Sequence, residues 1–285
     1  MKKLRYLAVF AAAFALAAFV LAGCGSSNAS KSDSASASGS AAASGSGFTL
    51  VVGFDSEYPP YGFLDASGNP TGFDIDLAKA VADANGWGFE AKAIDWDSKD
   101  LELQSGNINC IWNGFTMEGR EGKYTFSDPY MLNEQVIVVA SGSNVKALSD
   151  LAGKKVITQA GSAAFDLLSA EGDQADLAKT FDGGAVQTIA DYNNAFLQLE
   201  SGAIDAVACD LSIAQYQISQ TGSKYVQLGE NLTSEHYAVG FKTGDDSTAK
   251  AVTDSLKKLD SDGTVKKLCE KYAEYGLSYD NWILK

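Results

Sequence analysis

The stretch 197-LQLESGAIDAVACD-210 decides the fold, because it joins the end of an amphipathic helix, a Ser-Gly turn, a short apolar strand and a carboxylate. The earlier stretch 101-LELQSGNINCIWNG-114 has the same L-x-L-x-S-G-x-I-x skeleton. A helix that turns tightly into a buried strand is typical of an α/β unit, so the repetition predicts two successive units of the same kind. In the later unit the strand runs directly into Asp210, where a charge is costly unless something pairs with it.

The chain around the earlier stretch predicts a β-α-β-α-β unit. Its expected strands are 48–54, 89–94 and 108–112, and its second helix is 99–104. Asp74 suits the N-cap of the first helix, and Gly86 suits its end. Ligands of such open sheets bind beyond the carboxyl ends of the strands, where Asp55 and Asn113 are both placed.

The later stretch lies in a second series of alternating strands and helices. The expected strands are 135–140, 155–158, 178–181, 205–209 and 235–241, and the expected helices are 163–168, 189–199, 213–218, 248–259 and 264–275. Two like lobes, joined by strands near 136–140 and 236–241, would place their strand ends face to face across a cleft.

The N-terminus has the pattern of an export signal. A basic start precedes an apolar run at 6–22, and Leu21-Ala22-Gly23-Cys24 resembles the lipobox of bacterial lipoproteins. This implies a signal peptide at 1–23 that is cut before Cys24, and acylation of the Cys24 thiol. An uncleaved transmembrane anchor is the alternative. Residues 24–47, rich in Ser, Ala and Gly, then form a flexible tether.

Composition and charge exclude several partners. The chain has 285 residues, of which 46% are hydrophobic and 20% charged, enough for one large domain or two small ones. Loss of residues 1–23 removes Lys2, Lys3 and Arg5 and changes the formal net charge from -14 to -17. The strong negative charge of the mature chain argues against nucleic acid or anionic lipid as its target.

The cysteines beyond Cys24 do not match a metal site. Cys110, Cys209 and Cys269 are odd in number, and their spacings fit no metal motif. We expect three buried thiols and neither metal nor cofactor. A disulfide between Cys110 and Cys269 is the alternative.

Two charged residues can hold a zwitterion across the cleft. Arg120, in a Gly-flanked loop with Thr116, can offer its planar fork to a carboxylate, although a solvated surface arginine would look the same. The turn 159–163 opens a helix whose free N–H groups suit an anion, or it is an ordinary cap. A ligand with a carboxylate and an ammonium one carbon apart would take Arg120 from one lobe and Asp210 from the other.

The chain resembles the periplasmic-type solute-binding proteins of the polar amino-acid family, the extracytoplasmic receptors of ABC importers. The matching motifs are Asp55-x-x-Tyr58-x-Pro60-Tyr61, Gly72-Phe73-Asp74-x-Asp76-Leu77-Ala78, Leu103-x-Ser105-Gly106, Asn113-Gly114-x-Thr116, Arg120, Phe126-Ser127-Asp128-Pro129-Tyr130, Leu151-x-Gly153-Lys154-Lys155-Val156, Gly161-Ser162 and Ser201-Gly202-x-Ile204-Asp205-Ala206-Val207. The resemblance implies a type II fold of two lobes, each a sheet flanked by helices, joined by two hinge strands. Lobe 1 would be 48–139 plus 236–285, and lobe 2 would be 140–235.

The resemblance also implies a role for each site residue. The carboxylate clamp would be Arg120 with Thr116 and Ser162, and the ammonium would go to Asp210 with a carbonyl of Asn113 or Gly114. Tyr58 and Trp96 would sandwich the ligand's side chain, Asp55 would line its end, and Gln159 and Ala163 would touch it from lobe 2. Thr116 and Arg120 are four residues apart where many relatives have five, and Asn109 stands where Asp is frequent.

The implied function is capture of a polar amino acid by a lipid-anchored monomer, which closes on it and delivers it to an ABC permease. Asp55 and Glu57 would favour a cationic side chain if both point inward. Glu57 lies in a Pro-rich loop and is expected to face solvent, which favours a neutral polar ligand such as glutamine or cystine.

Two other functions compete with this one. Asp55 or Glu57 could act as general acid or base, as in dehydratases and peptidoglycan lyases that resemble this family. A Ser-His-Asp enzyme is disfavoured, because the only histidine, His236, lies in an apolar strand, and nucleotide-binding glycine motifs are absent. A ligand sensor for a receptor is disfavoured because no second span or cytoplasmic domain precedes Lys285.

Overall fold

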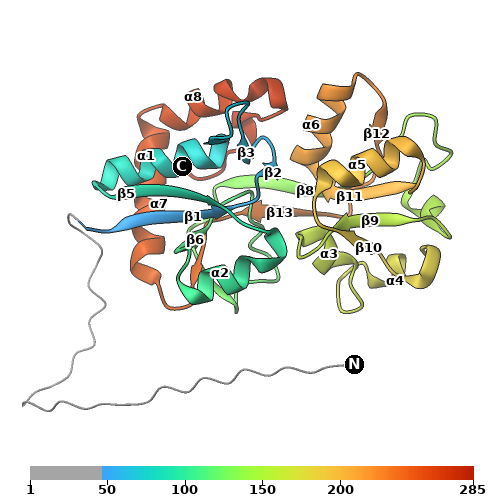
Figure 1. Ribbon diagram of the computed structural model, residues 1–285, viewed down its shortest axis with the longest axis horizontal. Helices are drawn as coiled ribbons and strands as arrows, with labels where there is room; N and C mark the ends of the chain where they lie inside the picture. Colours follow the sequence, from blue (N-terminus) through green and yellow to red (C-terminus); the bar gives the residue numbers. More distant parts are fainter. Residues whose placement is uncertain (1–46) are drawn as a thin grey trace, which may run out of the picture. The chain divides into compact units, whose positions relative to one another are not determined.

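The computed structural model describes residues 47–285, and within them it has the predicted α/β class. The predicted signal peptide, Cys24 and the tether up to residue 46 lie outside the described residues. The described residues form one five-stranded sheet, one six-stranded sheet and a small three-stranded sheet of β2 (Glu57–Tyr58), β3 (Gly62–Leu64) and β4 (Pro70–Thr71). Helices pack on the two large sheets, which define two lobes (Figure 1).

The first large sheet has the order β5-β1-β6-β14-β7. Its strands are β1 (Thr49–Phe54), β5 (Gly88–Ala93), β6 (Cys110–Ile111), β7 (Tyr124–Phe126) and β14 (Gly240–Lys242). Four strands run in the same direction, and only β14 among these five is antiparallel to its neighbours, β6 and β7. Leu50, Val52 and Phe54 of β1 face the helices α1 (Phe73–Asn85), α7 (Asp246–Ser261) and α8 (Thr264–Lys271), while Val51 packs in a separate cluster with α2 (Lys99–Ser105). Successive side chains along β1 therefore pack into the cores on opposite faces of the sheet.

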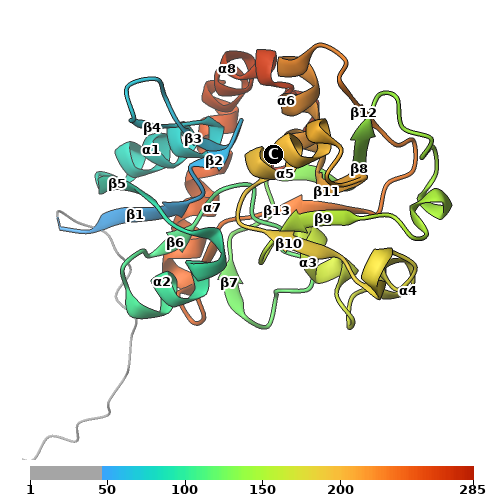
Figure 2. The same cartoon turned by 45° about the vertical axis from the view of Figure 1, so that its right-hand side comes forward.

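The second large sheet has the order β10-β9-β11-β8-β12, with β13 also paired to β8. Its strands are β8 (Met131–Ala140), β9 (Val156–Gln159), β10 (Gln187–Ile189), β11 (Ala206–Asp210), β12 (Tyr225–Gln227) and β13 (Thr233–Tyr237). Figure 2 shows α5 (Tyr192–Ser201) and α6 (Leu211–Thr221) on one face, and α3 (Ala163–Leu168) and α4 (Ala175–Ala178) on the other.

The two echoing stretches occupy equivalent places, as predicted. Each consists of a helix, α2 or α5, that ends at a glycine and leads into a strand, β6 or β11. Strand β6 pairs in parallel with β1, and β11 pairs in parallel with β9. Gly106 and Gly202 have φ of 79° and 73°. This left-handed conformation is open to glycine at little cost, which is why the Ser-Gly pair recurs at both helix ends.

The chain passes between the sheets twice, after β7 and after β13. The predicted strand 235–241 is interrupted, because β13 ends at Tyr237 and β14 begins at Gly240. Between them, the N–H of Ala238 donates to the carbonyl of Phe115, and the N–H of Val239 to Ser127 Oγ. Strand β13 pairs antiparallel with the first half of β8, so both crossing strands belong by pairing to the second sheet. The exact lobe limits stay a prediction.

The predicted strand 178–181 is wrong. Ala178 is the last residue of the short helix α4, and residues 179–181 follow that helix without forming a strand. Buried Ala178 and Phe181 pack in the core against the second sheet. The edge strand is instead β10, where Gln187 and Thr188 are exposed, so it lacks the apolar signal of a strand. The following helix begins at Tyr192 rather than at 189, because the Asp191 carboxylate caps it by accepting from the N–H of Asn194 at 2.8 Å.

Asp74 is not the N-cap of α1, because Gly72 takes that position. The carboxylate of Asp74 is fully buried in the first turn, where it accepts from the N–H of Gly114 at 2.6 Å and from the Tyr130 hydroxyl at 2.8 Å. Burial raises the pKa of Asp74 to about 7. Asp74 thus fastens the loop after β6, which carries much of the candidate site, to helix α1.

The three thiols are buried and free, so the alternative disulfide between Cys110 and Cys269 is not formed. Within residues 47–285, no helix is both long enough and apolar enough to cross a membrane.

Candidate ligand-binding site

The predicted site residues gather between the two sheets. The first lobe contributes Asp55 after β1, Tyr58 in β2, Trp96 before α2, and the loop 113–120 after β6. The second lobe contributes Gln159 at the end of β9, Ser162 before α3, and Asp210 at the end of β11. Except for residues 117–119 of the loop, these side chains are buried, so the carboxyl ends of the two sets of strands lie close together.

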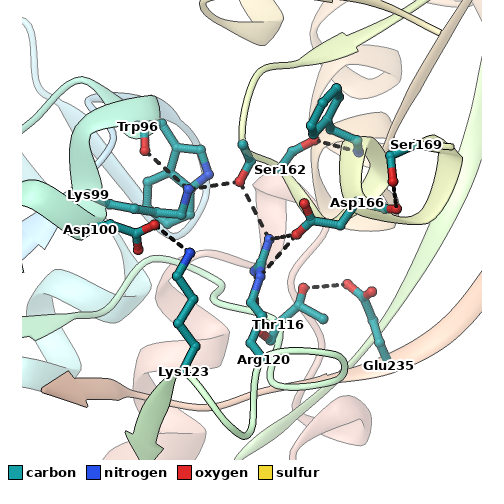
Figure 3. Close-up of polar contacts among 12 residues, drawn as sticks. Trp96, Lys99, Asp100, Thr116, Arg120, Lys123, Ser162, Asp166, Ser169 and Glu235 are labelled. Atoms are coloured by element: carbon teal, nitrogen blue, oxygen red, sulfur yellow. Dashed lines mark hydrogen bonds and ion pairs between the residues drawn. The ribbon is translucent and has the colours of Figure 1, made fainter. Parts of the chain in front are cut away.

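Arg120 reaches across to the second lobe (Figure 3). Its Nε and Nη2 donate to Asp166 Oδ2 of α3 at 3.2 and 2.7 Å. Among the described residues, the edge formed by Nη1 and Nη2 has only long contacts, to the carbonyls of Thr116 at 3.3 Å and Gly161 at 3.4 Å. The guanidinium also lies 4.8 Å from the centre of the Phe115 ring. One edge of the guanidinium is therefore held by Asp166, and the other edge can donate hydrogen bonds to a carboxylate.

A second cation, missed by the sequence reasoning, lies at the same corner. Lys99 is only 5% exposed, and its Nζ donates to the carbonyl of Gly161 at 2.9 Å and to that of Trp96 at 3.3 Å (Figure 3). Burial, with a smaller effect of Arg120, lowers the pKa of Lys99 to about 8. A lysine at a helix start looks like a surface residue, and no local signal distinguishes this one.

Asp210 belongs to a buried carboxyl pair whose other member, Glu235, the sequence reasoning also missed. Asp210 Oδ1 accepts from Asn133 Nδ2 at 2.8 Å, from Gln135 Nε2 at 2.7 Å and from the Tyr237 hydroxyl at 2.8 Å. Glu235 Oε1 accepts from the same two amides at 2.7 and 2.8 Å. The hydroxyl of Thr116 also donates to Glu235 Oε1, at 2.7 Å. Hydrogen bonds thus link Arg120 to Thr116 and Thr116 to Glu235, and the amides of Asn133 and Gln135 connect Glu235 to Asp210.

The carboxyl pair has no counter-ion in the part of the chain that the structure describes. Asp210 and Glu235 are each 3% exposed, and neither forms an ion pair with a basic side chain of residues 47–285. Burial raises the pKa of Asp210, and burial with the neighbouring Asp210 raises the pKa of Glu235 to about 7. Buried carboxylates are stable only with a cation or a proton, so this end of the site suits a cationic group.

The opposite end of the site offers hydrogen-bond acceptors. Asp55 is 6% exposed and accepts from Gln159 Nε2 of the second lobe at 2.5 Å. Burial raises the pKa of Asp55. Gln159 Oε1 and both polar atoms of the Asn113 side chain are buried without a partner among the described residues. Unsatisfied buried polar groups of this kind mark places where a ligand or water binds.

Both predicted aromatic residues, Tyr58 and Trp96, have protein partners. The Tyr58 ring lies 6.1 Å from that of Tyr192 in the second lobe, and its hydroxyl is 3.5 Å from the Tyr237 hydroxyl. The Trp96 ring lies beneath Lys99 Nζ at 5.1 Å. Gly114 is packed closely between Tyr58 and Tyr237, where a Cβ would lie 3.1 and 3.0 Å from their rings.

Ser162 and Glu57 are already bonded within the protein. Ser162 Oγ accepts from the N–H of Phe165 at 3.1 Å, which makes Ser162 the N-cap of α3. This is the ordinary helix cap that was the alternative for this turn. Glu57 is exposed, as expected, and accepts from Asn193 of the second lobe. His236 Nδ1 lies 2.5 Å from Glu118 Oε1. No cluster of His, Cys, Asp and Glu within residues 47–285 has the makeup of a metal site.

A cavity of about 580 Å³ opens between the lobes at the Arg120 end of the site. Both lobes line it, with Thr116, Arg120, Lys123, Ala163, Asp166 and Glu235 among the residues. Of the predicted site residues, Thr116, Arg120 and Ala163 line it, whereas the others do not: Asp55, Tyr58, Trp96, Asn113, Gly114, Gln159, Ser162 and Asp210. Asp210 is linked to the cavity residue Glu235 through the amides of Asn133 and Gln135. A cavity of this size and polar lining suits a small zwitterion.

Comparison with known proteins identifies a family that the chain matches over most of its length. Residues 50–275 match the model of the bacterial extracellular solute-binding proteins, family 3. A probable histidine-binding protein of Neisseria gonorrhoeae is 30% identical over 92% of this chain and 94% of its own length. An ABC transporter glutamine-binding protein of Bacillus subtilis is 30% identical over 95% of this chain and 97% of its own length.

The fold matches solved two-lobed structures. An ABC uptake transporter substrate-binding protein of Streptococcus pneumoniae, solved with bound histidine, superposes with a TM-score of 0.76 at 31% identity. The match covers 81% of this chain and 94% of the other.

Proposed function

Because the chain belongs to the bacterial extracellular solute-binding proteins, family 3, we propose that it binds a polar amino acid between its lobes and delivers it to an ABC transporter permease. The buried carboxyl pair, which has no counter-ion among residues 47–285, lies at one end of a hydrogen-bond chain that begins at Arg120, and it carries this proposal. An α-amino acid supplies both missing charges, an ammonium for the pair and a carboxylate for the arginine.

The ligand's carboxylate binds the Nη1–Nη2 edge of Arg120. That edge now has only two long contacts to carbonyls, whereas Asp166 holds the other edge. A bidentate carboxylate gives shorter, charge-assisted hydrogen bonds than a carbonyl does. Lys99, at the same corner, adds a second positive charge.

The ligand's side chain extends toward Asp55 and Gln159. The Asp55 carboxylate and Gln159 Oε1 are both acceptors, so this end selects side chains that donate hydrogen bonds. Basic side chains, amides and cystine meet this requirement, whereas acidic and aliphatic side chains leave buried acceptors unpaired. Glu57 faces outward and does not add a second charge here.

Closure of the lobes accompanies binding. The lobes touch through Asp55 and Gln159, through Lys99 and the Gly161 carbonyl, and through Arg120 and Asp166. Each lobe alone offers half of the ligand contacts, so the ligand shifts the population toward the closed form by a hinge motion. The permease then recognises this closed form.

A thermal-shift screen of the twenty amino acids with cystine and ornithine tests the ligand class. We expect arginine, lysine, ornithine, histidine, glutamine or cystine to raise the melting temperature, because a ligand that binds only the folded state stabilises it. At a ligand concentration about a hundredfold above the dissociation constant, the stabilisation is about 2.7 kcal/mol. Glutamate, aspartate and leucine serve as negative controls. A screen in which no amino acid changes the melting temperature contradicts the proposed function.

The chain is proposed to act as a monomer held at the outer face of the cell membrane by lipid on Cys24. The lipobox-like stretch and the Ser-rich tether support this, together with the extracellular family. In a bacterial host, Cys24→Ser is expected to abolish labelling by radioactive palmitate and to release the protein from membranes. Cys269→Ser, which removes a buried thiol, is the matched control and should keep the label. Membrane-bound, labelled Cys24→Ser protein would refute the anchor.

The other two functions have less support. The relatives named above are binding proteins, and His236 pairs with Glu118 rather than with a nucleophile. We therefore propose a binding protein without catalysis and without a signalling role of its own.

A further inference from the structure

We propose that Glu235 is a second acceptor of the ligand's ammonium group, and that it shares with Asp210 a proton that is released when the ammonium binds. The proposal rests on the amino-acid binding proposed above and adds a residue and a proton to it. The ion that replaces the proton is the ligand itself, so binding and deprotonation are one event.

The two carboxyl groups are close neighbours that share the same donors. Asp210 Oδ1 and Glu235 Oε1 both accept from Asn133 Nδ2, and both accept from Gln135 Nε2, at 2.7 to 2.8 Å. Neutral amides stabilise such a pair but cannot balance two negative charges. Without a cation, two buried carboxyl groups so close together hold a proton between them, because both cannot ionise at neutral pH.

Glu235 is the member of the pair that a ligand reaches. It lines the cavity beside Arg120, whereas Asp210 does not. Thr116, from the first lobe, donates its hydroxyl to Glu235. An ammonium in this cavity can therefore donate to Glu235, with the carboxylate of the same ligand at Arg120. The carboxyl proton leaves to the solvent, and the ammonium N–H groups donate to the freed oxygens.

The other charged and titratable groups around the pair do not replace the ligand. Tyr58 of β2, Tyr237 of β13 and Tyr192 of α5 surround Asp210, and burial raises the pKa of each hydroxyl well above its ordinary value. In the loop after β6, Arg120 is paired with Asp166 of α3. Glu118 of the same loop pairs with His236 instead of approaching the pair, and Lys123 lies farther along the cavity.

Calorimetry in buffers of different ionisation enthalpy counts the released protons. The probes are L-arginine and L-glutamine, because histidine titrates in the same pH range as the pair. At about pH 6.5 the wild type should release about half to one proton per ligand. The affinity should rise with pH, by up to about tenfold per unit below about pH 7, and level off above about pH 8. The affinity rises with pH, and does not fall, because the unliganded protein carries the proton that the ligand must displace. Raising the pH removes this proton before the ligand binds.

Glu235→Gln keeps an acceptor for the three donors and removes the titrating group. It should release close to no protons, lose the pH dependence, and bind about tenfold more weakly at about pH 8. His236→Gln, which removes the neighbouring imidazole, is the control and should release as many protons as the wild type.

The wild-type measurement alone can overturn the proposal, even if the variant does not fold. Binding of either probe without proton release contradicts it, and so does a Glu235→Gln variant that releases the wild-type number. If the wild type binds neither probe, the best ligand of the thermal-shift screen takes their place in the same measurement. If no amino acid of that screen binds, the proposed function is wrong, and this proposal fails with it.

Discussion

Asp210→Ala is expected to weaken amino-acid binding by about a hundredfold or more. Truncating one member of a buried, hydrogen-bonded charge pair commonly costs about 2 to 5 kcal/mol, and about 1.4 kcal/mol corresponds to a factor of ten. Asp210 is 3% exposed and accepts three hydrogen bonds, from Asn133, Gln135 and Tyr237. Its removal takes this acceptor from the buried Tyr237 hydroxyl, while the two amides keep Glu235 as an acceptor. It also takes half of the negative charge from the ammonium site.

Asp210→Asn separates the loss of charge from the loss of packing. The amide keeps the size and one oxygen acceptor, so the fold should survive, while binding should still fall by about tenfold or more because a neutral group cannot pair with an ammonium. Asp205→Asn is the control, since it removes a partly exposed carboxylate just before the same strand. Titration calorimetry measures all three. Near-normal affinity of a folded Asp210→Ala would exclude Asp210 from the site.

Much of the fold could be predicted from local sequence, because both lobes repeat one helix-turn-strand pattern. The Ser-Gly turns at Gly106 and Gly202 mark the repeat, and the buried strands that follow are apolar. The sequence-based predictions fail where tertiary contacts override local residue preferences. Asp74 has the residue type of a cap, yet the N–H of Gly114 and the Tyr130 hydroxyl bind its carboxylate inside the helix. The edge strand β10 is too polar to show a strand pattern.

The candidate site could be predicted where charged residues follow strand ends, as Asp55 and Asp210 do. Glu235 was missed because it lies inside a strand, although one signal was available. In β13 buried residues alternate, so Glu235 faces the same side as Tyr237. An acid at an inward position of a strand is a candidate for a functional group, because it needs a partner there. Asp166 offered no such signal, since its role depends on where α3 lies relative to Arg120.

Arg120→Ala is expected to weaken binding by about a hundredfold or more, for two separable reasons. The guanidinium is the proposed receptor of the ligand's carboxylate, and it also joins the lobes through Asp166 at 2.7 Å. A lost carboxylate contact acts on the ligand directly, whereas a lost bridge acts on the closed form. The Asp166 side chain is 56% exposed, and ion pairs with an exposed member contribute little. We therefore expect the ligand contact to dominate.

Two variants distinguish these reasons. Asp166→Asn breaks the bridge and leaves the guanidinium in place, so its affinity should stay within about tenfold of the wild type. Arg120→Lys keeps the charge but loses the planar fork, so it should bind much more weakly than Asp166→Asn and more tightly than Arg120→Ala. Calorimetry with the best ligand of the screen gives the order. If Asp166→Asn binds as weakly as Arg120→Ala, the arginine acts by holding the lobes together, and the carboxylate of the ligand must bind elsewhere, with Lys99 as the nearest buried cation.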